Sequence, residues 1–218
     1  GFLIQSWSAI ALLLLGLIAP SGIAASQPLA ARTSPLPVAS KSQSLAAQEI
    51  RKIPGPSPRQ TIDNFLALTG EAEREIRVAF ADGMQQPGWM FSEAVHGRID
   101  QASEKLQQST QALDLTQVAP ALRPMTGVGR MLQLRSLLLY DLAHTPDREI
   151  PDQATVRQER LKYWAIPKTP ISLVAVEESD IKGGKACQQC SAGDFLFSSE
   201  TINQVPEDFR RIFEGKPS

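Results

Sequence analysis

SPRQTIDNFLALTGEAEREIRVAFADG, residues 57–83, is the stretch that decides the fold class. Ser57 is a preferred N-cap residue, and Pro58 suits the first turn of a helix. Apolar or small residues then recur at spacings of three and four, which predicts one stripe of an amphipathic helix. The stripe consists of Ile62, Phe65, Thr69, Ala72, Ile76 and Ala79. Asp82-Gly83 and then Pro87-Gly88 predict its end.

Two more helices are predicted after it. Residues 92–113 repeat an apolar stripe from Val95 to Leu113. Because only a short Pro/Gly loop separates the first two helices, we expect them to pack as an antiparallel pair. The third helix, residues 125–143, is apolar on most sides, which predicts a place at the centre of the core. Its charged residues Arg130, Arg135 and Asp141 argue against a membrane span.

The residues after Pro146 have a different pattern. Ile171–Val176 is short and rich in β-branched residues, which predicts a strand, and Phe195–Phe197 predicts a second, antiparallel strand. Ser198 should cap one short helix and Pro206 should begin another. We therefore expect an α+β fold that is mainly α. It comprises an antiparallel helical hairpin or bundle, then a small β-hairpin with short C-terminal helices.

The amino-terminal part predicts export. Ala9–Ala19 reads AIALLLLGLIA, which is too short for a comfortable membrane span but fits the apolar core of a signal peptide. Cleavage is expected after Ala24 or Ala25, and an uncleaved anchor helix is the alternative. The first residue is Gly1 rather than Met, so we expect the true start to be missing.

Four segments follow from these patterns. We expect a signal peptide over residues 1–25 and a Pro/Ser/Ala-rich linker over 26–57, because proline resists both helix and sheet. A helical domain is predicted over 58–145, and a small α+β unit with the β-hairpin over 146–218.

Composition limits the function classes. The chain of 218 residues has 22 basic and 23 acidic side chains, a balance that argues against nucleic-acid binding. With two His and two Cys, it could fill a four-ligand zinc site only by pooling all four residues. Gly127-Val128-Gly129 lacks the preceding strand and third glycine of a nucleotide loop. We therefore expect no enzyme, no catalytic residue, no metal and no cofactor.

Cys187-Gln-Gln-Cys190 is the sharpest local motif. In an exported chain it predicts a small disulfide that stiffens a loop. The alternative is a thiol–disulfide redox pair, which in thioredoxin-like proteins lies near a βαβ pattern rather than between glycine-rich loops. The context favours the structural disulfide.

An aromatic-proline corner precedes the first predicted strand. Tyr163 and Trp164 are followed by Ile166-Pro167. Such a cluster could bind a peptide or a partner, or it could pack a corner of the core, which is the more common role.

Several pieces occur in an order that resembles a known family. Pro120-Ala-Leu-Arg-Pro124 precedes the Leu-rich helix, then comes Trp164-Ala-Ile-Pro-Lys-Thr-Pro-Ile171, then Gly193-Asp-Phe-Leu-Phe-Ser198. This arrangement resembles the extracytoplasmic N-terminal region of small-conductance-type mechanosensitive ion channels, especially cyanobacterial ones, over residues 57–213. There, W-x-I-P-G-T leads into a strand and G-E-F-L-F-S into a helix. Lys168 and Asp194 depart from that pattern, as does the cysteine pair.

The resemblance implies a periplasmic sensory or regulatory region of such a channel, with the pore portion absent from this chain. It implies attachment to the inner membrane through a missing C-terminal portion, the membrane-spanning channel part as partner, and a homo-oligomer. The candidate interaction residues are Trp164, Ile166, Pro167, Phe195 and Phe197. The alternatives are a stand-alone exported binding or scaffolding module, and an exported thiol–disulfide protein centred on Cys187 and Cys190.

Overall fold

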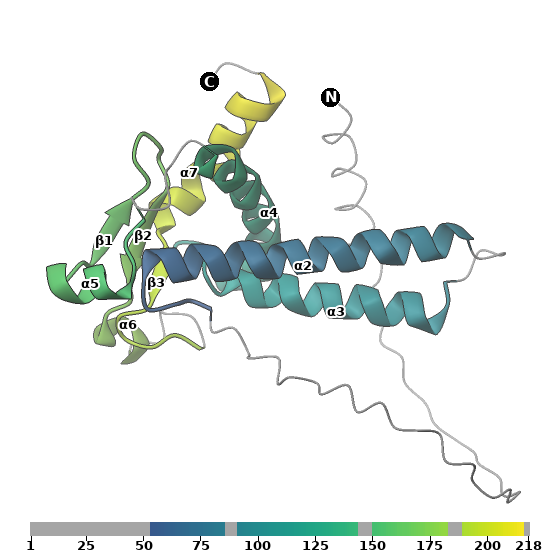
Figure 1. Cartoon of the computed structure of the whole chain (residues 1–218), viewed down its shortest axis with the longest axis horizontal. Helices are drawn as coiled ribbons and strands as arrows, with labels where there is room; N and C mark the ends of the chain where they lie inside the picture. The colour runs from purple at the N-terminus through teal and green to yellow at the C-terminus, as the bar shows by residue number, and fades with distance from the viewer. Residues whose placement is uncertain (1–52, 86–90, 144–149, 183–188, 216–218) are drawn as a thin grey trace, which may run out of the picture. The chain divides into compact units, whose positions relative to one another are not determined.

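The structure is a computed structural model that describes residues 53–85, 91–143, 150–182 and 189–215. Residues 51–218 form one compact unit. The predicted signal peptide, most of the predicted linker and Cys187 lie outside the described residues. The described part is mainly helical with one small antiparallel sheet, which confirms the expected α+β class (Figure 1).

The first two helices form the predicted antiparallel hairpin. They are α2 (Pro58–Gln85) and α3 (Glu93–Thr110), which lie side by side in Figure 1. The hydroxyl of Ser57 accepts the Gln60 amide at 3.2 Å, and Ser92 accepts the Val95 amide at 3.4 Å, so both helices begin at a serine cap. Ion pairs cross the hairpin from Lys105 to Glu71 at 3.3 Å and from Arg98 to Glu75 at 3.1 Å.

The third long helix is less buried than the sequence predicts. A short 3₁₀ turn, η1 (Pro120–Leu122), leads into α4 (Arg123–Leu142), with Pro124 in its first turn. One face of α4 packs against α3 and α7, yet Met125 and Leu139 on its other face are exposed. The expectation that this helix is central to the core is therefore wrong, because only one side of it is covered.

The sheet has three strands, one more than predicted. Its order is β1 (Tyr163–Ala165), β2 (Ser172–Ala175) and β3 (Phe195–Phe197), all antiparallel. The aromatic-proline corner of the sequence is thus the strand β1 and the turn after it. Of the two short helices, α5 (Gln153–Glu159) precedes β1 in the sequence and α6 (Glu178–Lys182) lies between β2 and β3.

A single helix follows β3. It is α7 (Ser199–Phe209), which passes through Pro206 and continues as the π-helical turn η3 (Arg210–Glu214). The sequence predicts a new helix at Pro206. The chain instead accommodates the proline inside α7, and the side chain of Arg210 donates to the Pro206 carbonyl at 3.2 Å.

Buried hydroxyl groups join α7 to the sheet. Thr201 Oγ1 accepts the Ser172 amide at 2.8 Å, and the hydroxyls of Ser172 and Ser198 lie 2.7 Å apart. All three side chains are buried, so each hydroxyl needs the others as hydrogen-bond partners. The network fixes the first turn of α7 against β2.

Candidate interaction edge

One edge of the sheet is closed by backbone hydrogen bonds. On β3, the Phe195 amide donates to the Gly55 carbonyl at 2.8 Å, and the Phe197 amide donates to the Ala112 carbonyl at 2.8 Å. The Asp114 amide donates back to Phe197 at 2.9 Å. The residues before α2 and after α3 therefore cover this side of the sheet.

The opposite edge is the strand β1. Ile166 donates to the Ile171 carbonyl, and Ala175 donates to the Lys162 carbonyl, both at 2.8 Å. Because hydrogen bonding alternates along an antiparallel pair, the backbone groups of Tyr163 and Ala165 point away from β2. We call this side of β1, from Tyr163 to Ala165, the open edge. Such an edge can pair with an extended segment of another chain.

The side chains of β1 are less buried than those of β2 and β3. Trp164 shares a face with Leu173 and Phe197, which are fully buried, but is itself half-buried. Tyr163 lies on the other face, in register with Val174, and is 53% exposed. Trp164 and Tyr163 thus present aromatic surface on both faces of the open edge.

The structure divides the predicted interaction residues into two groups. Ile166, Phe195 and Phe197 are buried, so their side chains are not on the surface of this fold, and their contact with a partner stays a prediction. Their side chains fill the core, where β3 packs against α2. Trp164 and Pro167 remain at least partly accessible, next to Tyr163. Of the predicted set, only Trp164 lies at the open edge, and Pro167 lies in the turn that follows it.

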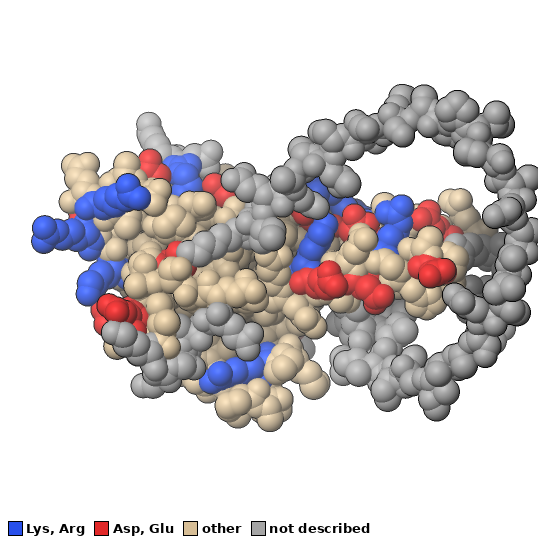
Figure 2. Space-filling model, turned by 90° about the horizontal axis from the view of Figure 1, so that it is seen from below, with Lys and Arg blue, Asp and Glu red and all other residues tan. Residues whose placement is uncertain are grey.

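A pocket of about 610 Å³ lies where β1 begins and β2 ends. Its floor includes Val156, Leu161 and Val176, and its rim carries charged groups of both signs. The charged residues are Arg157, Arg160, Lys162, Glu177 and Glu178. Basic side chains gather at the α5 end of the face seen in Figure 2, with acidic ones beside them. The sequence analysis missed this site, whose residues carry no motif and come from three separate segments.

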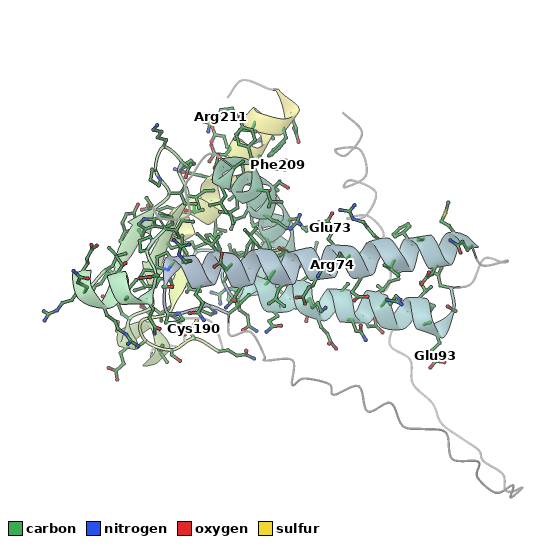
Figure 3. All side chains as sticks on the ribbon, in the orientation of Figure 1. Glu73, Arg74, Glu93, Cys190, Phe209 and Arg211 are labelled. Carbon is green, nitrogen blue, oxygen red and sulfur yellow. The ribbon has the colours of Figure 1, made fainter. Side chains whose placement is uncertain are left out.

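Cys190 belongs to a turn beside this pocket. Asp194 is buried, and its carboxylate accepts the Ser191 amide at 2.6 Å. Its backbone amide donates to the Ser191 carbonyl at 3.0 Å, so the aspartate fixes the turn from both ends. Cys190 is labelled in Figure 3. Cys187 lies outside the described residues, so their pairing stays a prediction.

Among the residues that the structure describes, Asp152 and Arg130 have shifted pKa values. The amide of Thr155 donates to the Asp152 carboxylate at 2.8 Å, and this bond lowers the pKa of Asp152 at the start of α5. On α4, burial and then the like charge of Arg210 lower the pKa of Arg130. Neither residue lies on the open edge. The first belongs to a helix cap and the second to the contact between α4 and α7.

Two further features, a cluster of metal ligands and a membrane-spanning helix, were sought among the described residues. Across residues 53–85, 91–143, 150–182 and 189–215, no three His, Cys, Asp or Glu side chains gather as metal ligands would. Among the helices described in those ranges, none has the length and apolar character to cross a membrane.

The chain has no match among known protein families, curated proteins or solved structures.

Proposed function

We propose that this chain is the periplasmic sensory or regulatory region of a small-conductance-type mechanosensitive channel, and that the open edge on β1 contacts the channel or its neighbour. One observation carries the proposal. Two of the three sequence pieces that resemble the channel family fold into a single substructure. Trp164–Ile171 forms most of β1 and the turn into β2, and Gly193–Ser198 forms β3 and the cap of α7.

The contacts between these pieces support the proposal further. The two pieces lie more than twenty positions apart in the sequence, and β2 joins them, because Leu173 pairs with Trp164 of one piece and with Phe197 of the other. The Ser172, Ser198 and Thr201 hydroxyls then link β2 to α7. The resemblance is supported because two of its separate pieces belong to one packed unit.

A region of this kind acts on a pore only through contacts that differ between the closed and open states. The open edge provides hydrogen-bonding groups at Tyr163 and Ala165 and aromatic surface at Trp164. These groups suit an extended polypeptide segment.

The experiment is patch-clamp recording from cells that express the complete gene encoding this chain, with and without residues 58–214. We expect the deletion to shift the membrane tension at which the channel opens. A conductance with an unchanged threshold, or the lack of any tension-activated conductance from the gene, would refute the proposal.

A further inference from the structure

The pocket where β1 begins and β2 ends has the size of a small-molecule site. Its volume is about 610 Å³, and pockets that bind small molecules measure about 300–1,000 Å³. Val156 of α5, Leu161 before β1 and Val176 after β2 line its floor with aliphatic side chains. Such a floor would cover the apolar part of a ligand and shield it from water.

The rim of this pocket carries two arginines from the end of α5, Arg157 and Arg160. Lys162 also lies on the rim, but its ammonium group pairs with Glu177 at 3.0 Å. Within the described ranges of the chain, no carboxylate pairs with Arg157 or Arg160. Basic side chains gather at this end of the molecule in Figure 2. The rim therefore offers two guanidinium groups without a counter-ion among the described residues.

The backbone of Arg160 shows that the cap of α5 does not require this side chain. Arg160 adopts a left-handed conformation with a φ of 51° and a ψ of 43°, and its amide donates to the Val156 carbonyl. Glycine is favoured at such a helix end, because a side chain costs free energy there. The hydrogen bonds of the cap come from the backbone. The guanidinium of Arg160 therefore remains available to a ligand at the rim.

The signs of the rim charges select one kind of ligand. Arg157 and Arg160 favour an anion, and a planar guanidinium group binds a carboxylate through two parallel hydrogen bonds. Glu177 and Glu178 also lie on the rim, so a doubly charged phosphate would be repelled more strongly than a single carboxylate. A ligand with one carboxylate and an apolar body matches both the rim and the floor.

We propose that this pocket binds an alkyl monocarboxylate. The carboxylate pairs with Arg157 and Arg160 on the rim, and the alkyl chain packs against Val156, Leu161 and Val176 on the floor. The inference goes beyond the proposed function, because it concerns a small-molecule site and not the open edge. Each of the two can therefore fail without the other.

Isothermal titration calorimetry of the full chain tests the class of ligand. The probes are octanoate, hexanoate, acetate and 1-hexanol. Each buried methylene strengthens binding by up to about fourfold, so octanoate should bind about tenfold more tightly than hexanoate. Acetate lacks the alkyl chain and 1-hexanol lacks the charge, so both should bind at least about tenfold more weakly than hexanoate.

Variants of the rim test the two arginines. Arg160→Gly suits the left-handed backbone and should not lower the melting temperature, whereas Arg157→Gln keeps a long polar side chain without the charge. Each should weaken octanoate binding by at least about fivefold, because a charged hydrogen-bond donor is lost. The matched control is Arg74→Gln, at an exposed arginine of α2 that is labelled in Figure 3 and does not line the pocket. It should change the dissociation constant by less than about twofold, since distant surface charges are screened, and circular dichroism should show that all variants keep the helical fold.

Four results would overturn the inference. The first is the lack of saturable octanoate binding, and the second is equal weakening of that binding by Arg74→Gln and by both rim variants. The third is 1-hexanol that binds as tightly as hexanoate, which would show an apolar cavity without recognition of an anion. The fourth is inorganic phosphate that displaces octanoate at equal concentration, which would assign the two arginines to phosphate.

Discussion

The ring of Phe65 on α2 meets the ring of Phe197 on β3 edge to face, with 5.2 Å between ring centroids and an angle of 64° between the planes. Both side chains are fully buried. Close to this pair, the hydroxyl of Thr61 contacts the Gly55 and Phe195 carbonyls at 3.2 and 3.0 Å. The helical hairpin and the sheet therefore share one core, and the open edge on β1 is held by the same packing.

Replacing Phe65 should unfold the hairpin and the sheet together. Phe65→Ala removes a buried ring and leaves a cavity beside Phe197, so we expect a loss of about 3–5 kcal/mol in the free energy of unfolding. Phe80→Ala is the control on the same helix, because Phe80 is 42% exposed and leaves no enclosed cavity, so its loss should be clearly smaller. Urea denaturation measures both, and similar losses would contradict the shared core.

The ion pair between Arg135 and Glu73 should contribute more than its counterparts on the surface. The two side chains are 12% and 22% exposed and lie 2.7 Å apart, and Figure 3 shows Glu73 on the side of α2 toward α4. Glu73→Gln leaves the guanidinium of Arg135 partly buried without its counter-ion and also removes the exposed pair between Glu73 and Arg77, which should add little, so we expect a loss of about 1–3 kcal/mol. Glu177→Gln breaks the exposed pair with Lys162 and should cost less than about 0.5 kcal/mol. Equal costs in thermal or urea unfolding would show that α2 and α4 are not joined by this pair.

The two glycines of α4 should respond oppositely to the same substitution. Leucine is a better helix former than glycine by close to 1 kcal/mol, which both sites would gain. At Gly127 the new side chain meets Leu115 and Thr110, so overpacking should produce a net loss of about 1–3 kcal/mol. At Gly129, where a Cβ atom would have no neighbour within 4 Å, the chain should keep the gain. Thermal unfolding compares the two variants, and a loss at Gly129 would contradict the open space found there.

The cap of α5 should weaken in acid. The pKa of Asp152 is lowered by the hydrogen bond from the Thr155 amide, so the folded state favours the carboxylate. The stabilisation is present above the unfolded pKa of about 3.9 and is lost as the pH falls through the folded value. Asp152→Asn keeps an oxygen acceptor without titrating. The amides of α5 should therefore differ in their protection from hydrogen exchange between wild type and Asp152→Asn, and this difference should change below about pH 4. A difference in protection that does not vary with pH would exclude the charge as its cause.

Regular periodicity made the long helices predictable from the sequence. The stripe that contains Ile62, Phe65 and Ala72 is buried as expected, because α2 has one apolar side and a serine cap. The strand Phe195–Phe197 has the predicted bounds, since three apolar residues follow Gly193-Asp194. Local patterns of this kind depend only on neighbours in the chain.

The remaining features depend on contacts between distant segments. β1 has three residues, too few for an alternation to appear, and it becomes a strand because Trp164 pairs with Leu173. Periodicity shows that α4 is apolar on two sides but cannot tell which side is covered. The candidate residues Phe195 and Phe197 are enclosed by α2 and by backbone bonds from Gly55 and Ala112. Because Gly55 and Ala112 cover the β3 side of the sheet, the open edge is on β1. The sequence alone could not predict which edge is covered.

The most direct test of the regulatory role is the tension threshold of the channel with a damaged open edge. Ala165→Pro removes an outward amide, which an edge strand tolerates, and Tyr163→Lys places a charge on the exposed face of β1. In patch-clamp recording from cells that express the complete gene, both variants should shift the opening threshold as the deletion of residues 58–214 does, whereas Met84→Lys should leave it unchanged. Thresholds that remain at the wild-type value in Ala165→Pro and Tyr163→Lys, while the deletion shifts them, would contradict the assignment of the contact to β1.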